Sequence, residues 1–153
     1  SDVYKRQRLD NDKTRGQQVA RLNELRLGIE PVAARLAASN ATAQQRAELL
    51  RLAARLAELE STPSPRVGEE LETDLRFHTL ILRASGNEML AALAPSLVAM
   101  LKGKSVFGSH KRDPISGTTQ LHMELARTID AGLADAAEET SRTILDRTRA
   151  ENG

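Results

Sequence analysis

Residues 74–90, DLRFHTLILRASGNEML, hold the pattern that decides the fold. They overlap a longer stretch, residues 67–84, in which apolar side chains recur three and four positions apart, and this spacing predicts an amphipathic helix. Gly86 follows, as expected after a helix C-terminus, because glycine adopts a left-handed backbone at little cost. Two polar residues share the buried face of this helix. Its predicted inner stripe is Leu71, Asp74, Leu75, His78, Ile81 and Leu82.

The chain before this helix begins with a polar stretch and then turns periodic. Residues 1–16 are charged and show little periodicity, so we expect an arm or a linker remnant there. Residues 17–39 keep helical spacing, but Gly28 and Pro31 predict one kinked helix or two short ones. The expected inner positions of this segment are Val19, Leu22, Leu25, Ile29, Val32, Ala33 and Leu36.

Two further helices flank the central one. Thr42 and Gln45 form a capping box, because the hydroxyl and the amide can each satisfy a free backbone donor, so a helix is expected over residues 43–59. Residues 88–101 predict another helix with a kink at Pro95. Its expected inner positions are Met89, Leu90, Leu93, Leu97 and Met100.

The last third of the chain contains a predicted loop and two helices. Gly103 is expected to end the preceding helix, and residues 103–117, with three glycines and a proline, predict a mobile loop that could cover a pocket. A fifth helix then ends at Gly132, and a sixth follows it. These two helices are marked by Leu121, His122, Leu125, Ala126 and Ile129, and by Ala137, Ser141, Ile144 and Leu145.

The composition agrees with a helical fold and excludes several classes of protein. With two Phe, one Tyr and no Trp among 153 residues, the apolar content is largely aliphatic, and we expect an all-α antiparallel bundle of about six helices over residues 17–150. The 22 basic and 21 acidic residues nearly balance, unlike a chain built on nucleic-acid binding. There is no cysteine for a thiolate metal site and no apolar run of membrane-spanning length.

Three polar residues on buried helix faces are candidates for chemistry. Asp74 and His78 are four positions apart, so their side chains lie on one helix face, and His122 repeats the pattern on the stripe that carries Leu125 and Ile129. Burying a carboxylate and imidazoles among aliphatic side chains is costly unless they pair or bind a cation. Oxygen and nitrogen ligands of this kind suit zinc, manganese, nickel or iron.

The same residues also allow an ordinary structural interpretation. An Asp and a His four residues apart often form a simple hydrogen-bonded pair, and His122 alone is more often a satisfied core residue than a ligand. His110 lies in the glycine-rich segment beside Lys111 and Arg112, where a solvated loop histidine is expected, so it is left out of the site.

The chain resembles the FCD domain, the C-terminal effector-binding domain of FadR-type regulators in the GntR family of bacterial transcription factors. The resemblance runs from about Leu22 to Arg149. It is carried by ELRLGIEPVAARLAA, by the capped start of the second helix, by DLRFHTLILRASGNEML and by HMELARTIDAG, of which DLRFH followed by SGN is the most specific.

The resemblance implies a divalent-metal site, often for zinc, nickel or manganese, completed by a small organic acid. Three of the family's four ligand positions carry over as Asp74, His78 and His122. The fourth is a histidine of the last helix, and Ile144 stands in its place, where an apolar side chain cannot ligate. Asp146 is two residues further on, about 200° around an ideal helix, so it is expected to point away. A weaker three-residue site and a metal-free pocket both remain open.

Arg26 resembles an arginine that the family often places beside an anionic effector. The equally weighted alternative is a surface salt bridge with Glu30, one helical turn away. Arg76 lies between Asp74 and His78 in sequence, but it should project away from them into solvent.

The resemblance implies a cytoplasmic homodimer that senses an effector for a transcriptional regulator. We expect no winged helix-turn-helix domain, which normally precedes this one, within these residues, so DNA binding is expected only through such a domain. Two alternatives stay open: a metal-free structural or dimerisation bundle, and a metal-dependent hydrolase. The enzyme is disfavoured because neither a general base with defined spacing nor paired Glu-x-x-His motifs are found, and we expect no catalytic residue.

Overall fold

The computed structural model describes residues 2–107 and 117–152, and this part of the chain is helical with no strand. The all-α prediction is confirmed. None of the described helices is long and apolar enough to cross a membrane. The helices are α1 (Asp2–Asn40), α2 (Ala43–Ser61), α3 (Glu69–Ala84), α4 (Glu88–Ala92), α5 (Ala94–Phe107), α6 (Thr119–Asp130) and α7 (Ala134–Asn152).

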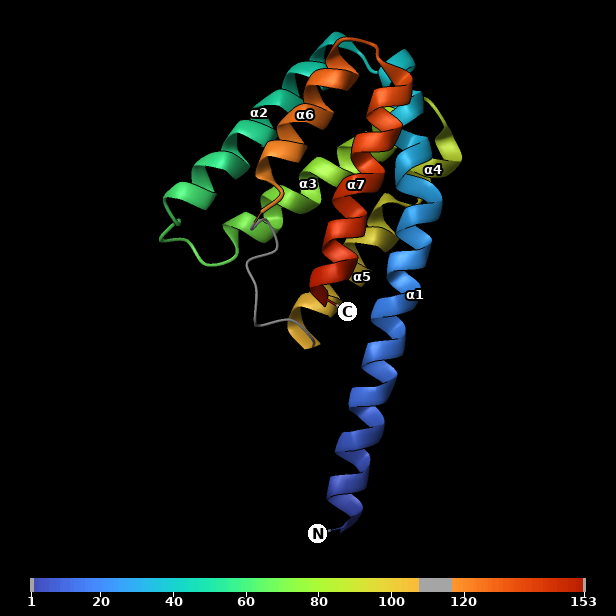
Figure 1. The fold of residues 1–153 in the computed structure, drawn as a ribbon, viewed down its shortest axis with the longest axis vertical. Coiled ribbons are helices and arrows are strands. Elements are labelled where there is room, and N and C mark those ends of the chain that lie inside the picture. The colour runs from blue at the N-terminus through green and yellow to red at the C-terminus, as the bar shows by residue number, and fades with distance from the viewer. Residues whose placement is uncertain (1, 108–116, 153) are drawn as a thin grey trace.

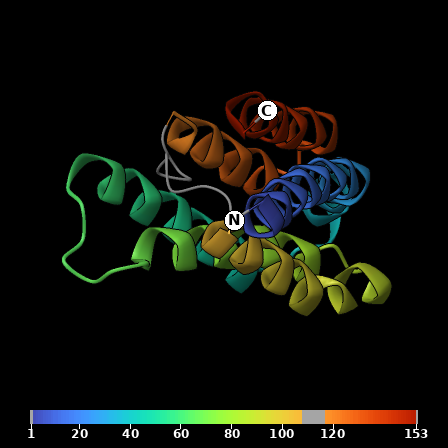
Figure 2. The ribbon, with the colours of Figure 1, turned by 90° about the horizontal axis from the view of Figure 1, so that it is seen from below.

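Pairings between neighbouring helices organise the bundle. The first and last helices, α1 and α7, run antiparallel side by side, α2 packs against α6 and α3, and α3 also contacts α1 (Figure 1). Seen from below, α1, α6 and α7 lie on one side of the bundle and α3, α4 and α5 on the other (Figure 2). The N-terminal part of α1 projects beyond the rest of the bundle (Figure 1). The centre of the bundle therefore lies where α1, α3 and α6 approach one another.

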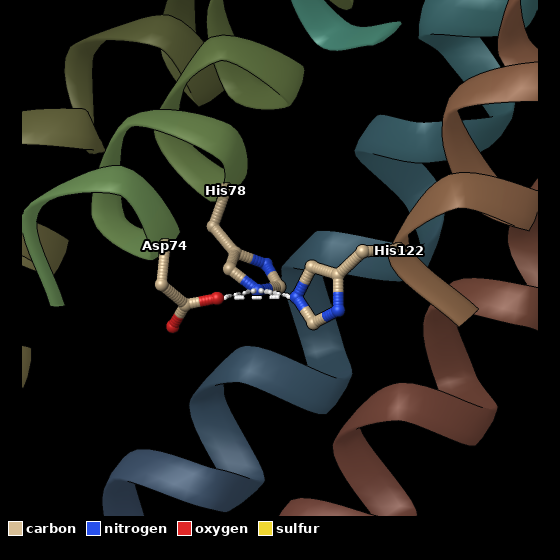
Figure 3. A group of neighbouring side chains, drawn as sticks. All are labelled: Asp74, His78 and His122. Carbon is tan, nitrogen blue, oxygen red and sulfur yellow. Dashed lines mark hydrogen bonds and ion pairs between the residues drawn. The ribbon is translucent and has the colours of Figure 1, made fainter. Parts of the chain in front are cut away.

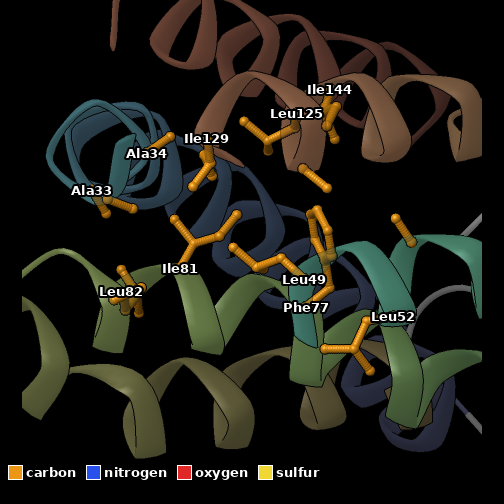
Figure 4. Close-up of a cluster of buried hydrophobic side chains, with 14 of the residues drawn as sticks. Ala33, Ala34, Leu49, Leu52, Phe77, Ile81, Leu82, Leu125, Ile129 and Ile144 are labelled. Atoms are coloured by element: carbon orange, nitrogen blue, oxygen red, sulfur yellow. The ribbon is translucent and has the colours of Figure 1, made fainter. Parts of the chain in front are cut away.

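The core between these helices is aliphatic and includes one aromatic ring (Figure 4). Phe77 on α3 is fully buried and packs among leucine and isoleucine side chains from α2, α6 and α7. The inner positions predicted for α6 and α7 are buried or half-buried, as are those of α3. Figure 4 labels Ala33, Ala34, Leu49, Leu52, Phe77, Ile81, Leu82, Leu125, Ile129 and Ile144.

Two predicted helix boundaries are confirmed in detail. The hydroxyl of Thr42 accepts from the backbone N–H of Gln45 at 3.0 Å, and the Gln45 side chain accepts from the Thr42 N–H at 2.9 Å. Gly86 has a φ of 75°, and a Cβ there would come 3.0 Å from the Cβ of Asn40. Asn40 also donates to the Ser85 carbonyl at 2.9 Å, so the end of α1 docks on the turn after α3.

The first helix differs from its prediction in length and in its buried face. Residues 2–16 are helical and continue α1, and neither Gly28 nor Pro31 interrupts it. Leu25 and Val32, predicted to face inward, are 41% and 45% exposed. Polar residues take their place. Within residues 13–40 of this helix, the buried residues are Leu22, Asn23, Arg26, Glu30, Pro31, Ala33, Ala34, Ala37 and Ala38.

The helix predicted over residues 88–101 is divided into α4 and α5 at Leu93. Pro95 lies in the first turn of α5, where its missing N–H costs no helical hydrogen bond. Met89, predicted to be inward, is 82% exposed on the single turn of α4. Gly103 does not end the helix, which continues to Phe107, because one glycine inside a packed helix costs only about 1 kcal/mol. The rest of the predicted loop, residues 108–116, lies outside the described residues.

Candidate metal centre

Three side chains from two helices meet between α1, α3 and α6 (Figure 3). Asp74 and His78 lie one turn apart on α3, and His122 comes from α6. The Nε2 atoms of the two histidines are 3.2 Å apart, and Asp74 Oδ1 lies 3.1 Å from His122 Nε2 and 3.3 Å from His78 Nε2. The sequence prediction that these three residues converge agrees with this geometry.

The second nitrogen of each imidazole fixes which atom faces the centre. His122 Nδ1 lies 2.7 Å from the backbone carbonyl of Thr118, which can only accept, so Nδ1 carries the proton. His78 Nδ1 lies 2.6 Å from Glu30 Oε1, a carboxylate that likewise accepts. In their neutral forms both histidines therefore present an unprotonated Nε2.

Three lone-pair atoms consequently point at one another. Two bare imidazole nitrogens and a carboxylate oxygen at 3.1–3.3 Å have no proton to share if both histidines are neutral. Such an arrangement is repulsive unless a positive charge lies among the atoms. Either a proton on one imidazole or a bound cation supplies that charge.

The spacing of the three atoms fits a first-row metal ion. Ligands about 2.0–2.1 Å from one ion lie about 2.9 Å apart at a right angle and about 3.4 Å apart at a tetrahedral angle. The separations of 3.1–3.3 Å fall between these limits. Two imidazoles and one carboxylate also form a donor set that zinc and its neighbours accept. The residues present therefore fit a divalent metal.

Without a metal, the positive charge falls on His78. Burial alone lowers the pKa of His78, but the carboxylates of Glu30 and Asp74 outweigh it and raise the pKa to about 9. Burial alone likewise raises the pKa of Asp74, yet the nearby imidazoles hold it well below its usual range. The centre is therefore an ionised cluster inside the bundle.

Glu30 is a residue of the centre that the sequence analysis missed. It lies on α1, its side chain is almost fully buried, and it joins His78 to Arg26, whose Nε donates to Glu30 Oε2 at 2.5 Å. Burial alone raises the pKa of Glu30, but Arg26 and His78 outweigh it and lower the pKa to about 2. The signal in the sequence is the Arg26–Glu30 spacing, for which a surface salt bridge is one of the two interpretations that the sequence allows. The salt bridge is present, but it is buried.

The start of α6 is held by a carboxylate from α2. Glu60 accepts from the backbone N–H of Gly117 at 3.1 Å and from the hydroxyl of Thr119 at 2.9 Å. These contacts flank Thr118, whose carbonyl orients His122. The ring of Phe77 lies 5.5 Å from the ring of His78 and 5.0 Å from that of His122, and it packs beside both imidazoles.

The remaining candidates lie away from the three donor atoms. Ile144 is buried on α7 and contributes only hydrocarbon. Asp146 is half-exposed and lies 3.4 Å from the Arg149 guanidinium, so it points away, as its position on the helix predicts. Arg76 is exposed and pairs with Glu72 on the surface. His110 lies outside the described residues.

Comparison with known proteins is consistent with the fold and identifies the family. No curated protein sequence matches the chain. A solved structure titled Streptococcus agalactiae GntR has a TM-score of 0.72 and 24% sequence identity, and the match covers 88% of this chain. It covers 60% of the other chain, so this chain spans less than two thirds of that protein. The family model of the FCD domain matches residues 21–147, within the predicted span of 17–150, whose ends stay a prediction. The chain therefore belongs to the FCD domain family.

Proposed function

We propose that this FCD domain binds one divalent metal ion through Asp74, His78 and His122 and uses it to sense a small carboxylic acid. The observation that carries the proposal is the convergence of two imidazole Nε2 atoms and one carboxylate oxygen at 3.1–3.3 Å. When bound, the metal would supply a positive centre with free coordination positions for water or a ligand carboxylate. Ile144, where the family has a fourth ligand, leaves one more such position.

Arg26 is the proposed protein contact for the same carboxylate. Glu30 accepts from Nε of Arg26, and no hydrogen bond from the two Nη groups of Arg26 is seen within the described residues. These groups offer a planar pair of donors of the kind that binds a carboxylate. Arg26 is also attracted by Asp74, so its guanidinium belongs to the same electrostatic cluster.

We infer binding without turnover. A metal-dependent hydrolase needs a base near the metal-bound water, with a pKa close to the working pH. Glu30 is unsuited to that role, because its pKa is lowered to about 2 and both its oxygens are already bonded to Arg26 and His78. The charge of this carboxylate holds the site together instead.

The regulatory role is proposed from the family and from the fold. A bacterial GntR-type regulator would carry this domain beside a DNA-binding domain, and effector binding would shift helix packing in a cytoplasmic dimer. The exposed side chains of Leu25 and Val32, two turns apart on α1, are the proposed dimer contacts. Sedimentation should show a dimer that Leu25→Lys with Val32→Lys converts to a monomer; a monomeric wild type would contradict this part.

Metal analysis combined with thermal unfolding tests the proposal. The purified protein should take up one equivalent of zinc or nickel, and small carboxylates should raise its unfolding temperature only in the presence of metal. His78→Ala and His122→Ala should each abolish the metal-dependent shift, whereas Arg76→Ala, on the exposed face of the same helix, should leave it unchanged. If neither metals nor acids stabilise the wild type, the sensor function is wrong.

A metal-free structural bundle is the alternative that the geometry also supports. A protonated His78 lies between the Glu30 and Asp74 carboxylates and can donate to both, so the cluster can be satisfied without metal. In that case metals would leave the stability of the wild type unchanged, and His78→Ala would destabilise the protein equally with and without zinc.

A further inference from the structure

Glu60 is a carboxylate whose position its own helix does not explain. It lies in the last turn of α2, where the partial negative charge of the helix end is unfavourable to a carboxylate, and this turn contains no basic residue. Its two oxygens contact another part of the chain: Oε2 accepts from the N–H of Gly117 at 3.1 Å, and Oε1 accepts from the hydroxyl of Thr119 at 2.9 Å. The contacts of Glu60 therefore serve the start of α6.

The start of α6 lacks the usual stabilising groups of its own. Its first turn contains no acidic residue, and the side chain of the N-cap residue Thr118 makes no capping hydrogen bond within the described chain. A carboxylate is favourable at this positive end of a helix. Gly117, with a φ of 79°, turns the chain so that its N–H points to Glu60. Glu60 thus supplies from α2 the negative charge that α6 lacks.

The first turn of α6 also determines the orientation of the His122 imidazole. The carbonyl of Thr118 accepts from the backbone N–H of His122 at 3.0 Å and lies 2.7 Å from Nδ1 of the same residue. Thr118 stands between the two residues that Glu60 holds. If this turn unwinds, the carbonyl leaves Nδ1, and the ring can carry its proton on Nε2 instead. An Nε2 that carries a proton cannot bind a metal.

The opposite end of α6 offers a comparison within the same helix. Arg46, near the start of α2, donates to the carbonyls of Ile129 and Asp130 at the end of α6. It also donates to two carbonyls at the end of α1. Ile129 lies seven residues, about two turns, after His122. Loss of Arg46 would therefore destabilise helix ends without acting directly on the carbonyl that orients His122.

We propose that Glu60 is a positioning residue of the metal centre. By holding the residues on both sides of Thr118, it keeps the Thr118 carbonyl against Nδ1 of His122 and directs the unprotonated Nε2 toward the other two donor atoms. The consequence for metal affinity rests on the proposed function, whereas the effect on the imidazole is a property of the metal-free protein as well. Glu60 therefore acts on the centre through His122, without contact with the metal.

Nitrogen-15 NMR of the histidine rings in the full metal-free chain tests the positioning. The wild type should contain His122 with its proton on Nδ1, and Glu60→Ala should move part of the population to the Nε2–H form. Glu58→Ala removes another carboxylate of the same turn, which pairs with Arg55, and should leave the His122 signals unchanged. Arg46→Met should lower the free energy of unfolding but should also keep the proton of His122 on Nδ1.

Zinc affinity, measured by competition with a chelator, tests the consequence for the metal. Glu60→Ala should weaken zinc binding by about tenfold, the lower end of the range for groups that orient a metal-binding imidazole, and Glu58→Ala should not change it. Thr119→Val keeps the shape of the side chain and removes only the hydroxyl contact, so it should weaken binding less. Combined with Glu60→Ala it should add no further loss, because the two residues act through one contact.

The outcomes separate this proposal from the proposed function. If Glu60→Ala leaves the proton of His122 on Nδ1, or if Arg46→Met moves it equally, Glu60 has no positioning role. If Glu60→Ala moves the proton but the wild type takes up no zinc, the positioning of His122 stands and metal binding is wrong. Glu60→Gln, which keeps the size and removes the charge, is measured in parallel and should move the proton in the same direction to a smaller extent.

Discussion

The two halves of the buried face of α1 have opposite chemistry. Toward its C-terminus the face consists of Ala33, Ala34, Ala37 and Ala38, all buried against neighbouring helices. One to three turns earlier the same face carries Asn23, Arg26 and Glu30, equally buried. Small apolar side chains let helices approach closely, whereas the carboxylate of Glu30 contacts His78 of the candidate metal centre. The helix thus builds the core with one half and the site with the other.

This difference teaches that burial alone does not identify the core. Arg26 and Glu30 are as inaccessible as the alanines, but breaking their pairing would leave a buried charge uncompensated. The stability of the alanine half depends instead on how well the side-chain volumes fill the space between the helices. Substitutions in the two halves should therefore differ in how much unfolding free energy they remove, in how that loss depends on pH, and in their effect on metal binding.

The largest effect is expected from Glu30→Ala. Removing this carboxylate leaves Arg26 as an unpaired buried charge and takes away the partner of His78 Nδ1. The free energy of unfolding should fall by about 3–5 kcal/mol, and metal affinity should fall with it. Urea unfolding with and without zinc measures both.

The double variant Arg26→Met with Glu30→Leu is its control and makes the polar half apolar. Because both charges are removed together, the unfolding free energy should return to within about 1–2 kcal/mol of the wild type. Metal binding should stay weak, since His78 has still lost its partner. A double variant as unstable as Glu30→Ala would contradict the view that the uncompensated charge causes the loss.

A smaller effect is expected from Ala34→Leu in the alanine half. Three added carbon atoms at a fully buried position should cost about 1–3 kcal/mol through overpacking. Zinc affinity, measured by competition with a chelator, should change little, because Ala34 contacts the core and not the donor atoms. A large loss of zinc affinity would show that the two halves are not independent.

The pH dependence of the unfolding free energy of the metal-free protein should arise from the polar half of the α1 face. The pKa of His78 is raised from 6.5 to about 9 by Glu30 and Asp74, against the opposing effect of burial. A group with a raised folded pKa stabilises the protein fully below the unfolded value, and this stability is lost as the pH rises through the folded value. Chelator-treated wild type should therefore lose stability from about pH 6.5 to about pH 9.

Unfolding free energies measured at both ends of that pH range check the expected slope, which is the decrease of stability with rising pH. Ala34→Leu should keep it, whereas Arg26→Met with Glu30→Leu should flatten it, because the carboxylate nearest His78 Nδ1 is gone. A slope of equal size in the double variant would exclude Glu30 as its cause.

The smallest effect is expected from Asp146→Ala. This carboxylate is half-exposed on α7 and pairs with Arg149 on the surface, where such pairs contribute about 0–1 kcal/mol. Metal affinity should not change, and a decrease in calorimetry would mean that Asp146 replaces the missing fourth ligand.

Much of the fold follows from local patterns in the sequence. The capping box at Thr42 and the left-handed Gly86 set helix ends with their own side chain or backbone, so they could be predicted without knowledge of the packing. The convergence of Asp74 and His122 could be predicted as well, because each breaks an apolar stripe.

What could not be predicted depends on tertiary contacts. Glu30 looks like any surface carboxylate one turn from an arginine, and only the packing of α1 against α3 reveals its contact with His78. The same packing turns Leu25 and Val32 outward, since Asn23, Arg26 and Glu30 occupy the buried face of the helix. The prediction that Met89 faces inward is wrong. The helix is divided at Leu93, so the buried face of α5 does not continue along α4.

X-ray absorption at the zinc edge of the protein loaded with one equivalent of zinc tests the central claim most directly. Ligation by Asp74, His78 and His122 predicts low-Z scatterers at about 2.0–2.1 Å with the outer-shell signal of two imidazoles, and His122→Ala should leave one. A spectrum without imidazole scattering, or one that His122→Ala does not alter, would contradict a metal centre between α3 and α6.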